Sequence, residues 1–133
     1  MPHCIVEYTN NLGPEARIRD LLDTLAAKFR DSDGVFPTGG IRVRAIRLDD
    51  YVIADGQGDD AFVHITTKIG PGRDPAFKQR FFDALFELVK AHFHVLAEQR
   101  PLALSLYVEE GGAQGSYKFN TIHARLKTAQ GHA

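Results

Sequence analysis

The chain has 133 residues and a mass of 14.8 kDa, with 16 basic and 17 acidic side chains and a formal net charge of −1. Its 44% hydrophobic and 25% charged residues are typical of one folded domain and exclude a disordered or fibrous protein. The balanced charge gives no positive field for a phosphate backbone, so we expect no nucleic-acid partner. The single cysteine, Cys4, excludes an internal disulfide and a four-thiolate zinc site.

The N-terminal residues lack the basic head and apolar run of a signal peptide, and no stretch reaches the roughly 18 apolar residues of a membrane span. We therefore expect a cytoplasmic protein with no membrane partner. Because Pro2 is small, we also expect methionine aminopeptidase to remove Met1 and to leave proline at the terminus.

The first half of the sequence predicts a strand, a helix and a second strand. Alternating side chains indicate a strand over His3–Tyr8. Pro14 suits a first helical position, and a helix is expected over Pro14–Arg30. Its apolar residues recur every three or four positions and form one stripe: Ile18, Leu21, Leu22, Leu25 and Phe29. Alternation over Ile41–Ile46 predicts the next strand.

The second half repeats this order. Alternation predicts a strand over Ala61–Ile69, and Asp74 can cap a helix that begins at Pro75 and runs to about Glu98. A fourth strand is expected over Leu102–Glu109. In the tail, residues 117–126 are expected to pair as an edge strand or to pack on a partner, and residues 128–133 to be loose.

The chain therefore reads as a single domain, 1–133, of two βαβ units at about 2–54 and 61–110 followed by a tail. The predicted fold class is α+β: a four-stranded mixed sheet with both helices on one face, parallel within each unit. The bare face would hold Phe62, His64 and Arg42 or their neighbours. Because this mixture is unsuited to open water, we expect other copies of the chain to cover it.

Five motifs are spread through nearly the whole chain. They are Pro2-His3-x-Ile5-Val6-Glu7, Gly40-Ile41-Arg42-x-Arg44, Ala54-Asp55-Gly56, Phe62-Val63-His64-x-Thr66-x-Lys68-Ile69-Gly70-x-Gly72-Arg73 and Leu85-Phe86-Glu87-Leu88. Together they resemble the 5-carboxymethyl-2-hydroxymuconate Δ-isomerase family of the tautomerase superfamily. The resemblance implies a tautomerase-like homotrimer that uses no metal or cofactor. It also implies isomerisation of a tricarboxylate dienol formed in bacterial breakdown of homoprotocatechuate.

Pro2 is the candidate catalytic residue. A terminal amine has a reference pKa of about 7.7–8.0, and burial or neighbouring cations lower it further. The neutral nitrogen could take a proton from the 2-hydroxyl of a dienol and return it to a distant carbon, moving the double bond. The other five prolines are tertiary amides without a basic nitrogen: Pro14, Pro37, Pro71, Pro75 and Pro101. The alternative is that Pro2 merely begins a strand.

Arg42 and Arg73 are the main candidates for binding substrate carboxylates. If the first two strands are parallel neighbours, their starting ends bring Arg42 near Pro2. If the first and third strands are antiparallel neighbours, the end of the third brings Ile69–Arg73 to the same place. Both guanidinium groups could then hold carboxylates through forked hydrogen bonds. The alternative is solvated surface charge.

Three further residues are candidates for substrate binding. Arg44 shares the strand face of Arg42, although it could instead serve a neighbouring subunit. His64 and Lys68 point to the bare sheet face, where they could line the pocket or make interface hydrogen bonds.

Other chemistry-bearing residues are not expected to act. His92 and His94 lie about 200° apart around a helix, so they cannot readily hold one metal ion. Cys4 is expected to be a buried, inert thiol.

The sequence thus predicts a cofactor-free isomerase acting on a 2-hydroxymuconate-type polycarboxylate, with Pro2 as the acid and base. Two alternatives remain: a tautomerase relative that acts on another 2-oxo- or 2-hydroxy-dienoate, and a non-catalytic trimeric protein of the same fold.

Overall fold

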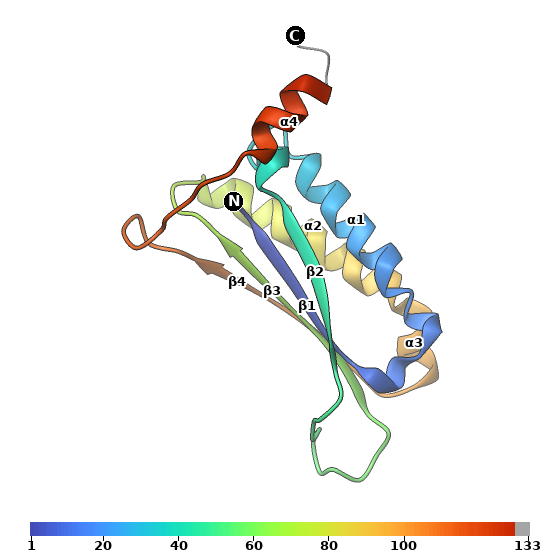
Figure 1. Ribbon diagram of the computed structural model, residues 1–133. Coiled ribbons are helices and arrows are strands. Elements are labelled where there is room, and N and C mark those ends of the chain that lie inside the picture. The colour runs from blue at the N-terminus through green and yellow to red at the C-terminus, as the bar shows by residue number, and fades with distance from the viewer. Residues whose placement is uncertain (130–133) are drawn as a thin grey trace.

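The computed structural model describes residues 1–129 and contains one four-stranded mixed sheet (Figure 1). Its strands are β1 (His3–Thr9), β2 (Arg42–Leu48), β3 (Ala61–Ile69) and β4 (Leu102–Glu110), in the order β2-β1-β3-β4. The β1–β2 and β3–β4 pairs are parallel, and the central β1–β3 pair is antiparallel. The predicted fold class is confirmed, because each βαβ unit contributes one parallel pair.

Both long helices, α1 (Ile18–Arg30) and α2 (Pro75–His92), cover the same face of the sheet (Figure 1). On that face the strands present alternate buried side chains, which meet the buried stripe of each helix. The sheet contributes Cys4, Val6, Ala61, Val63, Ile65 and Ile69, and the helices contribute Leu21, Leu25, Phe29, Phe81, Phe82, Leu85 and Val89. The stripe predicted for the first helix therefore does face the sheet.

The core contains a cluster of aromatic rings between the two helices. The Phe29 ring lies 5.1 Å from the rings of both Phe36 and Phe81, measured between centroids. Phe36 comes from the loop after α1, and its side chain is almost completely buried. Burying such a large side chain fixes the loop against α2, and α2 begins beside the starts of β1 and β2 (Figure 1).

The first helix starts later than predicted. Pro14–Ala16 forms a separate 3₁₀ turn, and Arg17 takes a left-handed conformation with φ of 43° before α1 begins at Ile18. Tertiary contacts account for the break: Ala16 is buried, and its carbonyl oxygen lies 2.7 Å from His92 Nε2 of α2. A continuous helix from Pro14 would not present that carbonyl sideways, because helical carbonyls point along the axis.

The second helix starts as predicted and ends earlier. Asp74 caps α2, since its carboxylate accepts a hydrogen bond of 3.3 Å from the Phe77 amide, and Pro75 is the first helical residue. At Phe93 the backbone leaves the α-helical region with φ of −99° and ψ of 9°, and a short helix, α3 (His94–Gln99), follows. The Phe93 side chain is fully buried, so packing in the core accompanies this break.

The prediction of an edge strand in the tail is wrong. After β4 the chain runs without regular structure to α4 (Ile122–Ala129), whose start is capped by the Asn120 carboxamide oxygen at 2.8 Å from the Ile122 amide. The tail thus packs on the turn Thr38–Gly40, which precedes β2, instead of extending the sheet. Thr128, predicted to be loose, lies in α4, and residues 130–133 lie outside the described part of the chain.

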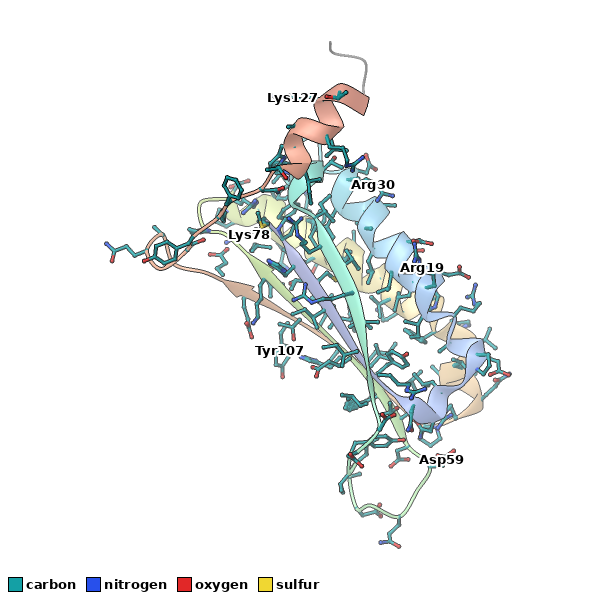
Figure 2. All side chains as sticks on the ribbon, viewed as in Figure 1. Arg19, Arg30, Asp59, Lys78, Tyr107 and Lys127 are labelled. Atoms are coloured by element: carbon teal, nitrogen blue, oxygen red, sulfur yellow. The ribbon has the colours of Figure 1, made fainter. Side chains whose placement is uncertain are left out.

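The face of the sheet away from α1 and α2 is open. Tyr107 of β4 projects from this side and is 64% exposed (Figure 2). His64 and Thr66 of β3 share this face, because they alternate with the buried residues of the strand. Within residues 1–129, no helix combines the length and the apolar character needed to cross a membrane.

Candidate active site

Three strand ends meet at one edge of the sheet. His3 of β1 lies opposite Arg42 of β2 on one side and opposite Lys68 of β3 on the other. The Arg42 amide donates a hydrogen bond of 3.1 Å to the Pro2 carbonyl oxygen, so the parallel pairing continues to the second residue of the chain. Both arrangements on which the sequence argument depended are therefore present, and they bring Pro2 and Arg42 together.

The chain's first residues lie in a close-packed position. Pro2 is buried, and a Cβ atom added at Gly40 would lie 3.2 Å from the Cα atom of Met1. Only a residue without a side chain allows this approach without displacing a neighbour. Gly40 belongs to the 3₁₀ turn Thr38–Gly40 that leads into β2, so the local backbone is shaped to receive the N-terminal segment.

The surroundings of the terminal amine lower its pKa. Burial lowers the pKa of the Met1 amine below its usual value of 8.0, and the charges of Lys118, Arg73 and Arg42 lower it further, in that order. Desolvation and positive neighbours both disfavour an ammonium ion. The terminal nitrogen is thus inclined towards the neutral, basic form near pH 7.

Backbone carbonyl groups hold the guanidinium group of Arg42. Its Nη1 donates to the carbonyl oxygens of Gly39 at 3.0 Å and Ile41 at 3.3 Å. These bonds fix the direction of the side chain and use part of its five-donor capacity. The remaining donors stay available for an anion.

Arg73 is fixed more firmly. Its Nη1 donates to the Gly70 carbonyl oxygen at 2.9 Å and its Nη2 to the Val35 carbonyl oxygen at 3.4 Å, while the guanidinium carbon lies 4.5 Å from the centre of the Phe36 ring. Its Nε is buried without a hydrogen-bond partner among the described residues. The group is therefore oriented in advance, and each of its two Nη atoms keeps a second N–H that could donate to an acceptor such as a carboxylate.

An open cavity of about 620 Å³ lies beside the N-terminus. Its wall includes Met1, His3, Lys68, Glu109 and Lys118. This volume lies within the usual range for small-molecule sites, roughly 300–1,000 Å³. The cavity therefore offers space for a small organic acid directly at the terminal amine.

Arg44 and Lys68, both predicted to bind substrate, lie close to the N-terminal cavity. Lys68 lines the cavity, and Arg44 contacts His3 through Nη1 and Nδ1 at 3.0 Å. Burial lowers the pKa of His3, and the charges of Arg44 and Arg42 lower it further. His3 is thus inclined to be neutral and to accept a hydrogen bond from Arg44.

Within one chain, His64 does not line the N-terminal cavity. It lies opposite Glu7, four positions along β3 from Lys68, which corresponds to roughly 13 Å at the usual strand rise. Its Nδ1 lies 2.6 Å from Ser105 Oγ, and its ring packs edge-on to that of Tyr107 at 4.8 Å. In one chain, His64 therefore belongs to the middle of the open sheet face.

Two residues of the site were missed by the sequence analysis. Lys118 lies in the tail, where neither periodicity nor a motif connects it to the N-terminus. His3 did carry a signal, since strand alternation places its side chain on the same face as the cross-strand residues Arg42 and Lys68. Only the pairing register shows that His3 lies directly between Arg42 and Lys68.

The other polar candidates have structural roles. His94 Nε2 lies 2.8 Å from the Glu98 carboxylate on the surface, and His92 bonds to Ala16 as described above. Cys4 is buried, as predicted, and burial raises the pKa of its thiol to about 12. Among residues 1–129, no three His, Cys, Asp or Glu side chains are grouped so as to hold a metal ion.

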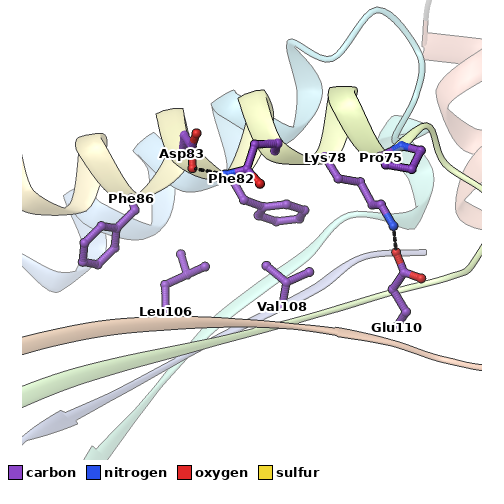
Figure 3. A pocket seen from close by; sticks show the side chains of 9 residues that line it. Pro75, Lys78, Phe82, Asp83, Phe86, Leu106, Val108 and Glu110 are labelled. Carbon is purple, nitrogen blue, oxygen red and sulfur yellow. Dashed lines mark hydrogen bonds and ion pairs between the residues drawn. The ribbon is translucent and has the colours of Figure 1, made fainter.

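A second cavity, of about 560 Å³, lies between α2 and the edge strand β4 (Figure 3). On one side Phe82 and Phe86 of α2 point towards Leu106 and Val108 of β4. At one end the cavity is closed by an ion pair between Lys78 and Glu110. The terminal residue Met1 does not line this cavity, whereas it does line the N-terminal one. The N-terminal cavity is therefore the better candidate for acid–base chemistry.

Comparison with known proteins shows the family of the chain. Residues 2–126 match the family described as 5-carboxymethyl-2-hydroxymuconate isomerase. The chain belongs to this family. A curated 5-carboxymethyl-2-hydroxymuconate Delta-isomerase from Escherichia coli is 44% identical over 131 residues, which cover 96% of this chain and 100% of the relative. As a member of the 5-carboxymethyl-2-hydroxymuconate isomerase family, the chain is an isomerase, as predicted from its sequence.

Solved structures of the same family share the fold. A crystal structure of a 5-carboxymethyl-2-hydroxymuconate isomerase from Deinococcus radiodurans R1 has a TM-score of 0.89 at 44% identity, covering 94% of this chain and 93% of that one. A second crystal structure, of a 5-carboxymethyl-2-hydroxymuconate delta-isomerase, has a TM-score of 0.84 at 31% identity, covering 95% and 93% of the two chains. The tautomerase-like fold predicted from the motifs is therefore confirmed.

Proposed function

We propose that this chain isomerises 5-carboxymethyl-2-hydroxymuconate, with Pro2 as the acid and base once Met1 has been removed. The observation that carries the proposal is the half-buried terminal amine among Lys118, Arg73 and Arg42. Pro2 follows directly in the chain, so its nitrogen would lie in the same field after removal of Met1. The names of the similar proteins supply the substrate.

The reaction needs only one proton to move. The neutral Pro2 nitrogen takes the proton from the 2-hydroxyl of the dienol, and the oxygen electrons form the 2-oxo group. The first double bond shifts along the chain, and the second opens at its far carbon, which takes the proton back from Pro2. Substrate and product have the same atoms and the same oxidation state, so the step requires no co-reactant.

Arginine side chains supply the positioning and the charge stabilisation. Arg42 and Arg73 each keep donors beyond their backbone hydrogen bonds, and each can bind one carboxylate. A carboxylate held there accumulates negative charge as the dienol loses its proton, and the fixed cations stabilise that charge. Arg44 and Lys68 belong to the same proposal as outer contacts, whereas His64 would reach a substrate only from another copy of the chain.

The proposal includes a homotrimer. The open sheet face exposes large side chains, among them Tyr107 at 64% and Ile46 at 46%, and it also carries the His64 group. Other copies of the chain would remove this surface from water. Light scattering coupled to gel filtration should give three times the 14.8 kDa mass of one chain. A monomer mass would contradict this part of the proposal.

The test compares processed and unprocessed protein on the same substrate. We expect protein that begins at Pro2, verified by N-terminal mass spectrometry, to convert the dienol, followed by its ultraviolet absorbance. Protein that retains Met1 should be inactive, because an acylated proline nitrogen is not basic. Full activity with Met1 retained would overturn the mechanism. Turnover of other dienoates alone would favour the broader tautomerase alternative, and no turnover at all would favour a non-catalytic protein.

A further inference from the structure

Residues 111–120, which lie between β4 and α4, cross the end of the sheet at which the N-terminus lies (Figure 1). We call these residues the strap. Ser116, Tyr117 and Lys118 of the strap line the N-terminal cavity together with Met1 and Lys68. A part of the chain more than 100 residues from Met1 in sequence thus forms one wall of the candidate active site.

Both ends of the strap are attached beside the cavity. At its start, the Gly111 amide donates a hydrogen bond of 2.9 Å to the Ile69 carbonyl oxygen. At its end, Asn120 Nδ2 donates to the Gly39 carbonyl oxygen at 2.8 Å, the same oxygen that accepts from Arg42 Nη1. The strap is therefore connected directly to the turn that orients Arg42.

The helix after the strap reinforces this attachment. A Cβ atom added at Gly39 would lie only 2.4 Å from His123 Nδ1 of α4, so α4 packs directly on the glycine turn. Between the attached ends, Gly115 has φ of 85°, a left-handed conformation that favours glycine and lets the chain reverse towards the cavity.

Two lysines line the cavity, Lys68 and Lys118, and of these only Lys68 has a carboxylate residue directly opposite it on a neighbouring strand. Lys68 lies directly opposite Glu109 on the neighbouring strand, and Lys78 is paired with Glu110. Among residues 1–129, Lys118 makes no ion pair. It is also the cation with the largest effect on the neighbouring terminal amine, and this independently indicates that its charge faces the site.

We propose that Lys118 binds the third carboxylate of the substrate, the one on its carboxymethyl branch, and so makes the site prefer a tricarboxylate over a dicarboxylate. This inference rests on the proposed function. Arg42 and Arg73 can each take one carboxylate, and a branched acid presents one more that must leave the cavity near its open side. Tyr117, next to Lys118, is 93% exposed and marks that side. A lysine suits this place, because its flexible stem follows the branch to the solvent edge.

The test measures binding of two saturated acids that cannot react: hexanedioate, and the same acid with a carboxymethyl branch, 2-(carboxymethyl)hexanedioate. By isothermal titration calorimetry, we expect the unmodified protein to bind the tricarboxylate about fivefold more tightly, the ratio typical of one partly solvated charge pair. Lys118→Met should reduce this ratio to about one, and Lys118→Arg should keep it. Lys127→Met, which removes a lysine from α4 outside the cavity, is the matched control and should leave the ratio unchanged.

Several outcomes would overturn the inference. They are equal affinities in the unmodified protein, an unchanged ratio in Lys118→Met, and an equal weakening of both acids in Lys118→Met, which would mean that Lys118 acts only through the general field. Turnover of the dienol, measured in parallel, keeps the two proposals separate. Turnover without discrimination refutes the role of Lys118 alone, and discrimination without turnover refutes the proposed function alone.

Discussion

The guanidinium carbon of Arg73 lies 4.5 Å from the centre of the buried Phe36 ring. The same ring contacts Phe29 and Phe81 in the core, each at 5.1 Å between centroids. A candidate substrate-binding residue therefore rests on the aromatic core of the protein. Substitutions in that core should therefore change the orientation of Arg73.

Phe36→Leu tests this connection. We expect kcat/KM to fall by up to about tenfold, because the cation–π contact that orients Arg73 is lost. The free energy of unfolding should fall by about 1 kcal/mol as the aromatic cluster loses a ring. Val89→Ala is the control, since Val89 is fully buried in α2, whereas Arg73 is held by Gly70, Val35 and Phe36. It should lose comparable stability in urea titrations and keep normal kinetics. Equal activity losses in both variants would argue against a special role for Phe36.

Arg73→Met should lower kcat/KM by about 100-fold, since a substrate carboxylate loses a charged partner in a partly buried site. The pH profile should change as well. Arg73 lowers the pKa of the terminal amine, so its removal raises that pKa, and the rising limb of kcat/KM moves to higher pH. Arg80→Met removes an exposed arginine on α2 and should change neither quantity. A limb that stays in place in Arg73→Met would contradict the electrostatic argument.

Pro2→Ala tests the acid and base directly. We expect kcat to fall by about 10²- to 10⁴-fold, the usual contribution of a positioned general base, because the ring no longer fixes the direction of the nitrogen lone pair. Binding of hexanedioate should survive, since Arg42 and Arg73 are unchanged. Pro101→Ala, at the exposed start of β4, is the matched control and should be fully active. Unimpaired turnover in Pro2→Ala would remove Pro2 from the mechanism.

Asn120→Ala should loosen the strap from the glycine turn. The variant loses the hydrogen bond to the Gly39 carbonyl oxygen, so we expect trypsin to cleave after Lys118 several times faster. The preference for the tricarboxylate should fall only partly, because the lysine itself remains. Asn10→Ala removes two surface hydrogen bonds, one to Asp49 at 3.2 Å and one from the Tyr51 hydroxyl at 2.9 Å, and should leave the tail as resistant as before. Unchanged cleavage in Asn120→Ala would show that α4 alone holds the strap.

Cys4 should be unreactive in the folded protein. Burial raises the pKa of its thiol to about 12, so thiolate is scarce below that pH and a disulfide reagent should react only after unfolding in urea. Cys4→Ala should keep full activity and lose about 1 kcal/mol of stability. Rapid labelling at pH 8 without denaturant would contradict the burial of Cys4.

Side-chain periodicity was sufficient to predict the four strands, because buried residues on half-buried strands recur at every second position, as Val63, Ile65 and Thr67 do in β3. It was insufficient for the helix ends. The first break, at Arg17, follows the buried residue Ala16, and the second lies at Phe93, which is itself buried. Burial of these side chains depends on contacts with residues far away in the chain. The tail was mispredicted for a related reason: α4 is positioned by its packing on Gly39, and no local pattern in the tail encodes that partner.

The sequence by itself determined the fold class and the strand pairing that places Pro2 beside Arg42, because strand direction and βαβ handedness leave few ways to arrange two such units. The resemblance of its motifs indicated the family. Only the tertiary structure decided that Lys118 lines the cavity and that His64 does not. Strand pairing is a regular relation that residue spacing can reveal. A strap attached by individual hydrogen bonds at its two ends follows no period, so its position depends on three-dimensional contacts alone.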